Sequence, residues 1–182
     1  MREDLPEISL QPGEVYLSRR PAILKTILGS CVGVTFWSAR LQAGALCHGI
    51  LPLCPPHTGA TEGYRYVDFS IRYLAGQFDL LGAARQELEI KVFGGADVLP
   101  VAAVTRAKPT VGVMNCQAAL AVLATEGLRV GASDLGGTRG RTLRFHTGTG
   151  EVLLQRLARL PAASRAEIDP AAGPGRKRRL FL

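Results

Sequence analysis

Four short apolar runs follow one another between residues 14 and 51, and they constrain the fold more than any other feature of the sequence. The third run, Cys31–Ser38 (CVGVTFWS), is rich in β-branched and aromatic residues, which is typical of a buried strand. A polar break separates it from the fourth run, Ala43–Leu51, so the two predict a hairpin that ends at Pro52. The runs Glu14–Ser18 and Ala22–Leu28 predict two further strands.

The rest of the chain mixes helices with strands. Apolar residues at steps of three and four predict a helix over 67–83, and an Ala/Leu-rich segment predicts a second helix at 115–125. Strands are predicted at 88–93, 128–132, 142–147 and 151–157, the last two joined in a hairpin. Residues 53–66 are rich in Pro, Gly and Thr and predict a long loop. We therefore expect an α/β (α+β) fold, a layered α/β sandwich with a mostly antiparallel β-sheet core.

The length of 182 residues suits one domain, which we expect at residues 1–160. From residue 161 onward, Pro, Ala, Gly and basic residues follow one another with little periodicity. This composition predicts a flexible basic C-terminal tail over residues 161–182, in which the run Arg176–Arg179 concentrates the positive charge.

The net charge of +7, from 22 basic and 15 acidic residues, raises nucleic acid as a partner. The chain has no recognised nucleic-acid module and no aromatic residues interleaved with basic ones, so we expect no such partner. It also lacks an apolar run long enough to span a membrane and an N-terminal secretory signal. We therefore expect a cytoplasmic protein without stable membrane insertion, in which disulfides are rare.

Cys31 and His48 are the candidate reactive pair. Cys31 follows a Gly-Ser turn, where free backbone N–H groups can lower the pKa of a thiol and hold an oxyanion. His48 lies 17 residues further on, across the predicted hairpin, where side chains at matching register come within about 5 Å. The thiol and the imidazole could then meet, as nucleophile activation requires. Each residue also has a structural interpretation, as a small core side chain or as a buried histidine bonded to a carbonyl.

The other cysteines and histidines predict no metal site. Cys47, Cys54 and His57 cluster in the sequence, but there is no Cys-x-x-Cys pair and the spacing matches no standard zinc site. Cys47 adjoins His48 in the same run, so we expect it to point to the opposite face, into the core. His57 and His146 are interpreted as solvated loop or strand residues.

The glycine pairs predict turns. Gly94-Gly95 and Gly136-Gly137 match no dinucleotide or P-loop fingerprint, so no nucleotide cofactor is expected. Gly94-Gly95 follows a predicted strand and indicates a tight turn or a close approach of two backbones. The residues Arg139, Arg141 and Arg144 predict either a basic edge or an ordinary solvated face of one hairpin.

The segment TILGSCVGV at 26–34 resembles the CheD family of chemoreceptor glutamine deamidases. Four more segments resemble that family in the same order: CHGILP at 47–52, KVFGGADVL at 91–99, VGVMNCQAAL at 111–120 and DLGGTRGRTLRF at 134–145. Together they cover roughly residues 12–157. The resemblance implies a fold similar to that of the cytotoxic necrotizing factor deamidases, a layered sandwich with a Cys–His pair.

The resemblance also implies the roles of three residues. Cys31 falls on the family's nucleophile and His48 on its catalytic histidine. Thr26, five residues before Cys31, falls on the residue that orients the histidine, although some members place that residue six before, where this chain has Lys25. The implied reaction converts a receptor glutamine to glutamate through a thioester on Cys31, with no metal and no organic cofactor. The same acyl-enzyme would also form from a glutamyl methyl ester.

The partners that the resemblance implies are methyl-accepting chemotaxis proteins, as substrates, and a CheC-type phosphatase. An alternative function is that of a non-catalytic adaptor that binds receptors or a CheC-type phosphatase. The presence of both Cys31 and His48 favours the enzyme, because binding alone requires neither.

Overall fold

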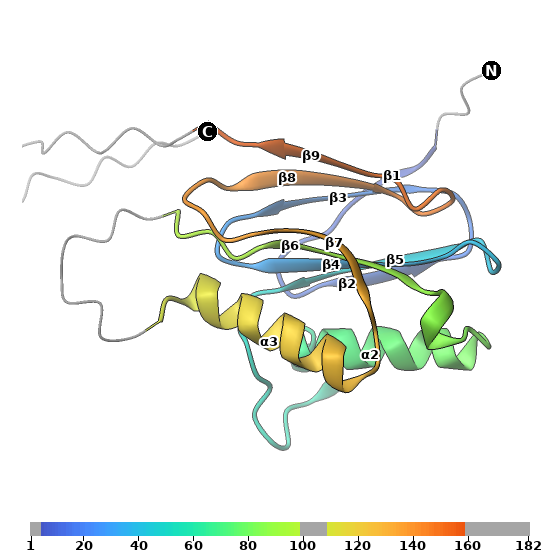
Figure 1. Cartoon of the computed structure of the whole chain (residues 1–182), viewed down its shortest axis with the longest axis horizontal. Helices are drawn as coiled ribbons and strands as arrows, with labels where there is room; N and C mark the ends of the chain where they lie inside the picture. Colours follow the sequence, from blue (N-terminus) through green and yellow to red (C-terminus); the bar gives the residue numbers. More distant parts are fainter. Residues whose placement is uncertain (1–4, 99–108, 159–182) are drawn as a thin grey trace, which may run out of the picture.

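The structure is a computed structural model that describes residues 5–98 and 109–158. These residues form three layers: two β-sheets stacked face to face, and helices that cover the outer side of one sheet (Figure 1). The first sheet contains, in spatial order, β1 (Glu7–Ser9), β3 (Ile23–Leu28), β8 (Arg141–His146) and β9 (Val152–Arg156). The second sheet contains β2 (Val15–Ser18), β5 (Ala43–Gly49), β4 (Val32–Ser38), β6 (Glu89–Gly94) and β7 (Val130–Leu135).

Two longer helices, α2 (Val67–Leu80) and α3 (Val111–Thr125), lie against the second sheet, and the short α1 (Ala60–Gly63) and the 3-10 turn η1 (Arg85–Glu87) connect the elements. Within the described ranges, β1 with β3 and β6 with β7 are the parallel pairs, and the remaining pairs are antiparallel. The structure thus confirms the predicted layered α/β sandwich with a mostly antiparallel core. In the part of the chain that the structure describes, no helix is long and apolar enough to cross a membrane.

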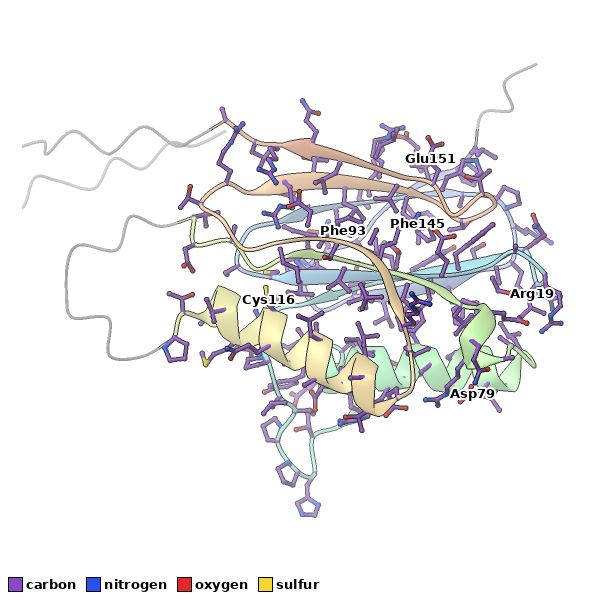
Figure 2. All side chains as sticks on the ribbon, in the orientation of Figure 1. Arg19, Asp79, Phe93, Cys116, Phe145 and Glu151 are labelled. Carbon is purple, nitrogen blue, oxygen red and sulfur yellow. The ribbon has the colours of Figure 1, made fainter. Side chains whose placement is uncertain are left out.

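The second sheet is buried on both faces. Toward the helices it forms the helix-side core, where Phe36 of β4 stacks on Phe78 of α2 with ring centroids 5.9 Å apart. Toward the first sheet it forms the inter-sheet core, in which Phe93 and Phe145 lie between the sheets (Figure 2). This double burial explains why the strand sequences of β4 and β5 are almost continuously apolar instead of alternating.

Most predicted elements are present within a few residues of their expected limits, including the hairpins β4–β5 and β8–β9. The helix α3 begins at Val111, four residues before its predicted start, because the Thr110 side chain caps it by accepting a hydrogen bond from the Val113 N–H (3.3 Å). The strand β1 was not predicted: its short polar sequence becomes a strand only by pairing with β3. The predicted loop at 53–66 contains α1.

The predicted basic tail at residues 161–182 lies outside the described residues. The boundary predicted at residue 160 also lies outside the described residues, and the domain at 1–160 stays a prediction.

Candidate active site

The side chains of Cys31 and His48 both face the space between the two sheets. In β5, Cys47 packs in the helix-side core and Leu46 packs in the inter-sheet core. Because neighbouring strand residues point to opposite faces, His48 lies on the same face as Leu46. Cys31, just before β4, packs against the same inter-sheet core. The structure therefore confirms that Cys47 belongs to the core and points away from His48.

The register of the β4–β5 hairpin places Cys31 diagonally across from His48. Gly33 pairs directly with His48, and Cys31 precedes Gly33 by two residues. Diagonal neighbours on one face of a sheet lie about 7–8 Å apart, within reach of each other's side chains. A Cβ at Gly33 would lie 3.0 Å from Leu28 in the inter-sheet core, so glycine makes room for Leu28 at the position that pairs with His48.

Thr26 reaches the imidazole from the opposite sheet. Its Oγ1 lies 2.7 Å from His48 Nδ1, and its hydroxyl donates to the Leu10 carbonyl at 3.0 Å. Since the hydroxyl has one proton and gives it to Leu10, it must accept a hydrogen bond from Nδ1–H. The neutral ring then carries its proton on Nδ1 and a lone pair on Nε2. Nε2 is buried and has no hydrogen-bond partner among the described residues, so it is free to take a proton.

The N-terminal segment holds the backbone of His48 in place. The His48 N–H donates to the Glu14 carbonyl at 2.9 Å, and the His48 carbonyl accepts from the Gly13 N–H at 2.8 Å. The same segment supplies the Leu10 carbonyl that fixes Thr26. Leu10 and Gly13, which precede the first predicted strand, thus contribute to the site, although no sequence pattern indicated this.

Burial sets the charge state of the pair. The His48 side chain is almost completely buried, and burial lowers its pKa to about 4, although the Leu10 carbonyl and the Glu14 charge raise the pKa in part. Burial likewise raises the pKa of the Cys31 thiol, against a smaller lowering effect of its own backbone N–H. At neutral pH the resting site therefore contains a thiol and a neutral imidazole, rather than a thiolate and an imidazolium.

Three donors hold the turn that carries Cys31. The Gly29 carbonyl accepts from the Ala96 N–H (2.8 Å), and the Cys31 carbonyl accepts from the Gly95 N–H (2.8 Å). The Ser30 carbonyl accepts from Asn115 Nδ2 (3.0 Å). All three carbonyl groups of the turn are thus engaged by partners outside it.

The predicted close backbone approach at Gly94-Gly95 is confirmed. Both residues have positive φ angles, 115° and 68°. A Cβ at Gly94 would collide with the Cys31 carbonyl oxygen, and one at Gly95 would collide with Cys116 Sγ on α3. Figure 2 shows the Cys116 side chain on the side of α3 that faces the sheets. Side chains at these two positions are therefore incompatible with the turn that holds Cys31.

The interpretation of Arg141 as part of a solvated or basic edge is wrong. Its side chain is 2% exposed and donates to the carbonyl groups of Gly94 (2.6 Å), Asp134 (2.7 Å) and Gly136 (2.6 Å). Arg141 shares the inward face of β8 with Leu143 and Phe145, and this alternation was the signal in the sequence. The buried guanidinium is thus paired with backbone carbonyl groups of the segments that contain Gly94 and Gly136.

The two other arginines of this group lie at the surface. Arg144 is exposed and pairs with Glu7 at 2.6 Å, and Arg139 donates to the Leu157 carbonyl. For these two residues the expectation of a solvated face is confirmed.

Asn115 is the second residue of the site that sequence reasoning missed. It lies in the second turn of α3, is fully buried, and donates from Nδ2 to both the Ser30 and the Ile50 carbonyl groups (3.0 and 3.1 Å). The sequence did contain a signal for its burial. Asn115 lies three residues after Gly112 and four before Ala119, so the helical spacing places all three on one buried face of α3.

The cysteine and histidine cluster at 47–57 is spread over different surroundings. Cys54 and His57 line an open cavity of about 500 Å³ beneath the loop, together with Asp68 and Arg72 of α2. His57 is exposed, as expected for a solvated loop residue. Across residues 5–98 and 109–158, no group of three or more His, Cys, Asp or Glu side chains is placed to hold a metal ion.

Comparisons with known proteins agree on one family. The family model described as CheD chemotactic sensory transduction matches residues 50–156. A probable chemoreceptor glutamine deamidase of Geobacter sulfurreducens is 44% identical over 88% of this chain and 96% of its own length. A relative of the same name from Oleidesulfovibrio alaskensis is 39% identical over 84% of this chain and 74% of its own length.

Among solved structures, the hypothetical protein YfiH of Bacillus licheniformis covers 69% of this chain and 50% of its own, with a TM-score of 0.42 and 12% identity. The family model and the relatives each cover more than half of the chain, and all of them indicate the same family. The chain belongs to the CheD family.

Proposed function

We propose that this protein is a chemoreceptor glutamine deamidase, which hydrolyses the side-chain carboxamide of specific glutamines in methyl-accepting chemotaxis proteins to glutamate and ammonia. The relatives described above bear that name. One structural observation carries the proposal: Thr26 and the Leu10 carbonyl hold the His48 ring with Nε2 unprotonated, on the face of the sheet where Cys31 lies.

The first half of the reaction forms a thioester. Cys31 Sγ attacks the carboxamide carbon while His48 Nε2 takes the thiol proton, and the carbonyl electron pair moves onto oxygen. The tetrahedral intermediate then collapses: the carbon–nitrogen bond breaks, and His48 gives its proton to the departing ammonia. Thr26 keeps the ring oriented throughout, which is the role of the third member of a triad.

The second half regenerates the enzyme. A water molecule gives a proton to His48 and attacks the thioester carbon, and the carbon–sulfur bond breaks to leave glutamate and a reprotonated Cys31 thiol. A glutamyl methyl ester would form the same acyl-enzyme with loss of methanol, so we expect a methylesterase side activity. None of these steps draws on a group from outside the chain other than water.

The neutral resting state of Cys31 and His48 suits these proton transfers. A thiol with a raised pKa and an imidazole with a lowered pKa exchange the proton only when the substrate is attacked. General-base catalysis of this kind supplies roughly 10²- to 10⁴-fold in rate.

We place the reaction in the cytoplasm, on the cytoplasmic part of the receptors. All four cysteines are free, as is usual in a reducing compartment. A CheC-type phosphatase is the second partner that we propose. The alternative, a non-catalytic adaptor, gives no role to a buried imidazole whose Nε2 is unpaired among the described residues.

The test is direct. The protein is incubated with a receptor cytoplasmic fragment, and Gln-to-Glu conversion is mapped by mass spectrometry. We expect conversion by the wild type and by Cys54→Ala, a matched control because Cys54 is also partly exposed but lies in the loop beneath the helices. Cys31→Ala should be inactive. Conversion that persists in Cys31→Ala would refute the nucleophile, and no conversion by the wild type would leave the adaptor as the better explanation.

A further inference from the structure

The orientation of one peptide bond in the active site is fixed from outside the turn that contains it. A peptide unit is planar, and in the trans form its C=O and its N–H point in opposite directions. The carbonyl of Ser30 and the N–H of Cys31 belong to one such unit. Any group that holds the Ser30 carbonyl on one side therefore aims the Cys31 N–H to the other.

Asn115 is the side chain that holds this carbonyl. Its Nδ2 donates to Ser30, just before the nucleophile, and to Ile50, two residues after His48. Two carbonyl acceptors on one atom identify that atom as the amide nitrogen. The amide thus ties the thiol turn to the end of the strand that carries the imidazole.

The other end of the Asn115 amide is unpaired. Its Oδ1 is buried and has no hydrogen-bond partner among the described residues. A buried acceptor without a partner is costly and requires an explanation. The burial of Asn115 is not explained by its own polar atoms, because one of them has no partner. It is explained by the hydrogen bonds that Nδ2 donates to the Ser30 and Ile50 carbonyl groups.

Because the Ser30 carbonyl points toward Asn115, the Cys31 N–H of the same peptide unit points away from Asn115. No backbone carbonyl in the described part of the chain accepts a hydrogen bond from it. It interacts instead with the sulfur of its own side chain, where it favours the thiolate. A donor at this place is next to the carbon that the sulfur attacks, and so next to the oxygen on which negative charge develops.

We propose that Asn115 is a positioning residue that, by holding the Ser30 carbonyl, aims the Cys31 N–H at the oxyanion of the tetrahedral intermediate. The inference rests on the proposed function and deepens it. Without the amide, the Ser30–Cys31 peptide can rotate, and the carbonyl dipole then opposes the developing charge. The loss is confined to steps in which a carbonyl oxygen becomes negative.

Two reactions of the same sulfur separate this role from others. Acylation of Cys31 by 4-nitrophenyl acetate passes through an oxyanion and releases 4-nitrophenol, whereas alkylation by iodoacetamide displaces iodide and forms no oxyanion. Both rates are measured at Cys31 by peptide mass spectrometry, with Cys31→Ala as the blank. In Asn115→Ala we expect acylation to fall by roughly 10²- to 10³-fold, as on loss of one oxyanion donor, with alkylation near the wild-type rate.

Two further variants complete the experiment. Asn115→Asp keeps the shape of the side chain but removes its donors, so it tests the inference even if Asn115→Ala folds poorly, and it should also lose acylation selectively. Gln117→Ala removes an exposed amide two residues further along α3 and should behave as the wild type. Thermal unfolding of each variant is measured in parallel.

The outcomes are distinct. Equal losses of acylation and alkylation would mean that Asn115 merely supports the fold, and unchanged acylation in both variants would overturn the inference. The two reactions need no receptor. A wild type that is acylated but converts no receptor glutamine therefore refutes the proposed function alone, and leaves the role of Asn115 to be decided by the ratio of the two rates.

Discussion

At the scale of the residue, one hydroxyl proton decides which nitrogen of the His48 ring can act as a base. The Thr26 hydroxyl donates a hydrogen bond to the Leu10 carbonyl and therefore accepts one from Nδ1–H. A hydroxyl is uncharged, so it orients the ring without the strong stabilisation of the imidazolium that a carboxylate would supply. Burial lowers the pKa of His48 to about 4, against smaller raising effects of the Leu10 carbonyl and the Glu14 charge.

Replacing Thr26 by valine keeps the volume and removes the hydroxyl. The His48 ring then loses its partner at Nδ1 and can carry its proton on either nitrogen, so we expect deamidation to fall by up to roughly 10²-fold. Thr26→Ser keeps the hydroxyl and should retain most of the activity. The measurement is the initial rate of Gln-to-Glu conversion. Equal rates for Thr26→Val and Thr26→Ser would show that the hydroxyl does not orient the ring.

The thiol of Cys31 should titrate above the ordinary range, because burial raises its pKa. We expect the rate of its alkylation by iodoacetamide to rise about tenfold per pH unit through neutrality and to continue rising where a free cysteine, with a pKa near 8.5, levels off. A plateau below pH 7 would instead reveal a preformed thiolate–imidazolium pair and contradict the neutral resting state. A short unstructured cysteine peptide provides the reference curve.

At the scale of the element, the strands of the second sheet carry the site because their ends are fixed by other elements. The end of β6 meets the turn of Cys31 through Gly94-Gly95, and α3 meets it through Asn115. The glycine pair is required by contact as well as by φ. These contacts hold the turn in place, although it lies outside the ladder of β4.

Gly95 and Gly127 provide a matched test of that contact. Both have a φ of 68°, but nothing lies within 4 Å of a Cβ at Gly127, whereas one at Gly95 would collide with Cys116 Sγ. Gly127→Ala should cost only the backbone strain, about 1–2 kcal/mol. Gly95→Ala should cost more and also reduce deamidation. Urea unfolding measures both free energies, and equal costs would show that the contact has no effect.

Arg141 and Arg144 give a second matched pair, on one strand. Lysine at 141 cannot reach the three carbonyl groups that the guanidinium binds, so we expect Arg141→Lys to lose about 3 kcal/mol of stability. Arg144 is an exposed partner of Glu7, and Arg144→Lys should change stability by at most about 0.5 kcal/mol. If denaturant midpoints of the two variants coincided, the buried role of Arg141 would be disproved.

The elements were predicted from the sequence where local pattern determines them. The hairpin of β4 and β5 follows from two apolar runs and a polar break, and its register brought the two candidate reactive residues to one face. The strand β1 forms only by pairing with β3, so local pattern gave no prediction of it. The alternation with Leu143 and Phe145 did indicate that Arg141 is buried, and it was misinterpreted because arginine is usually exposed. Thr26 was assigned through the resemblance alone, because no local pattern indicates that β3 faces β5 across the inter-sheet core.

At the scale of the whole molecule, burial of an uncharged His48 makes stability depend on pH. The unfolded chain binds a proton at this side chain below about pH 6.5, but the folded chain does so only below about pH 4. The free energy of unfolding therefore falls as the pH drops through this window, by at most about 3 kcal/mol from this group. It is fully regained above pH 6.5.

Urea unfolding between pH 7 and pH 4 measures this effect. His48→Gln removes the titrating group and should reduce the pH dependence of unfolding in that window, while other groups contribute equally to both proteins. A wild type and a variant with parallel pH profiles would show that His48 titrates normally in the folded state.

The imidazole and the thiol belong to the second sheet, whereas Thr26 belongs to the first. The chemistry is therefore sensitive to the spacing between two layers that pack mainly through apolar side chains. A shift of one sheet over the other by the length of a hydrogen bond would break the contact between Thr26 and His48 before either sheet lost a strand pairing. We therefore expect catalytic activity to depend on the alignment of the two sheets, and to disappear at a gentler perturbation than the one that unfolds them.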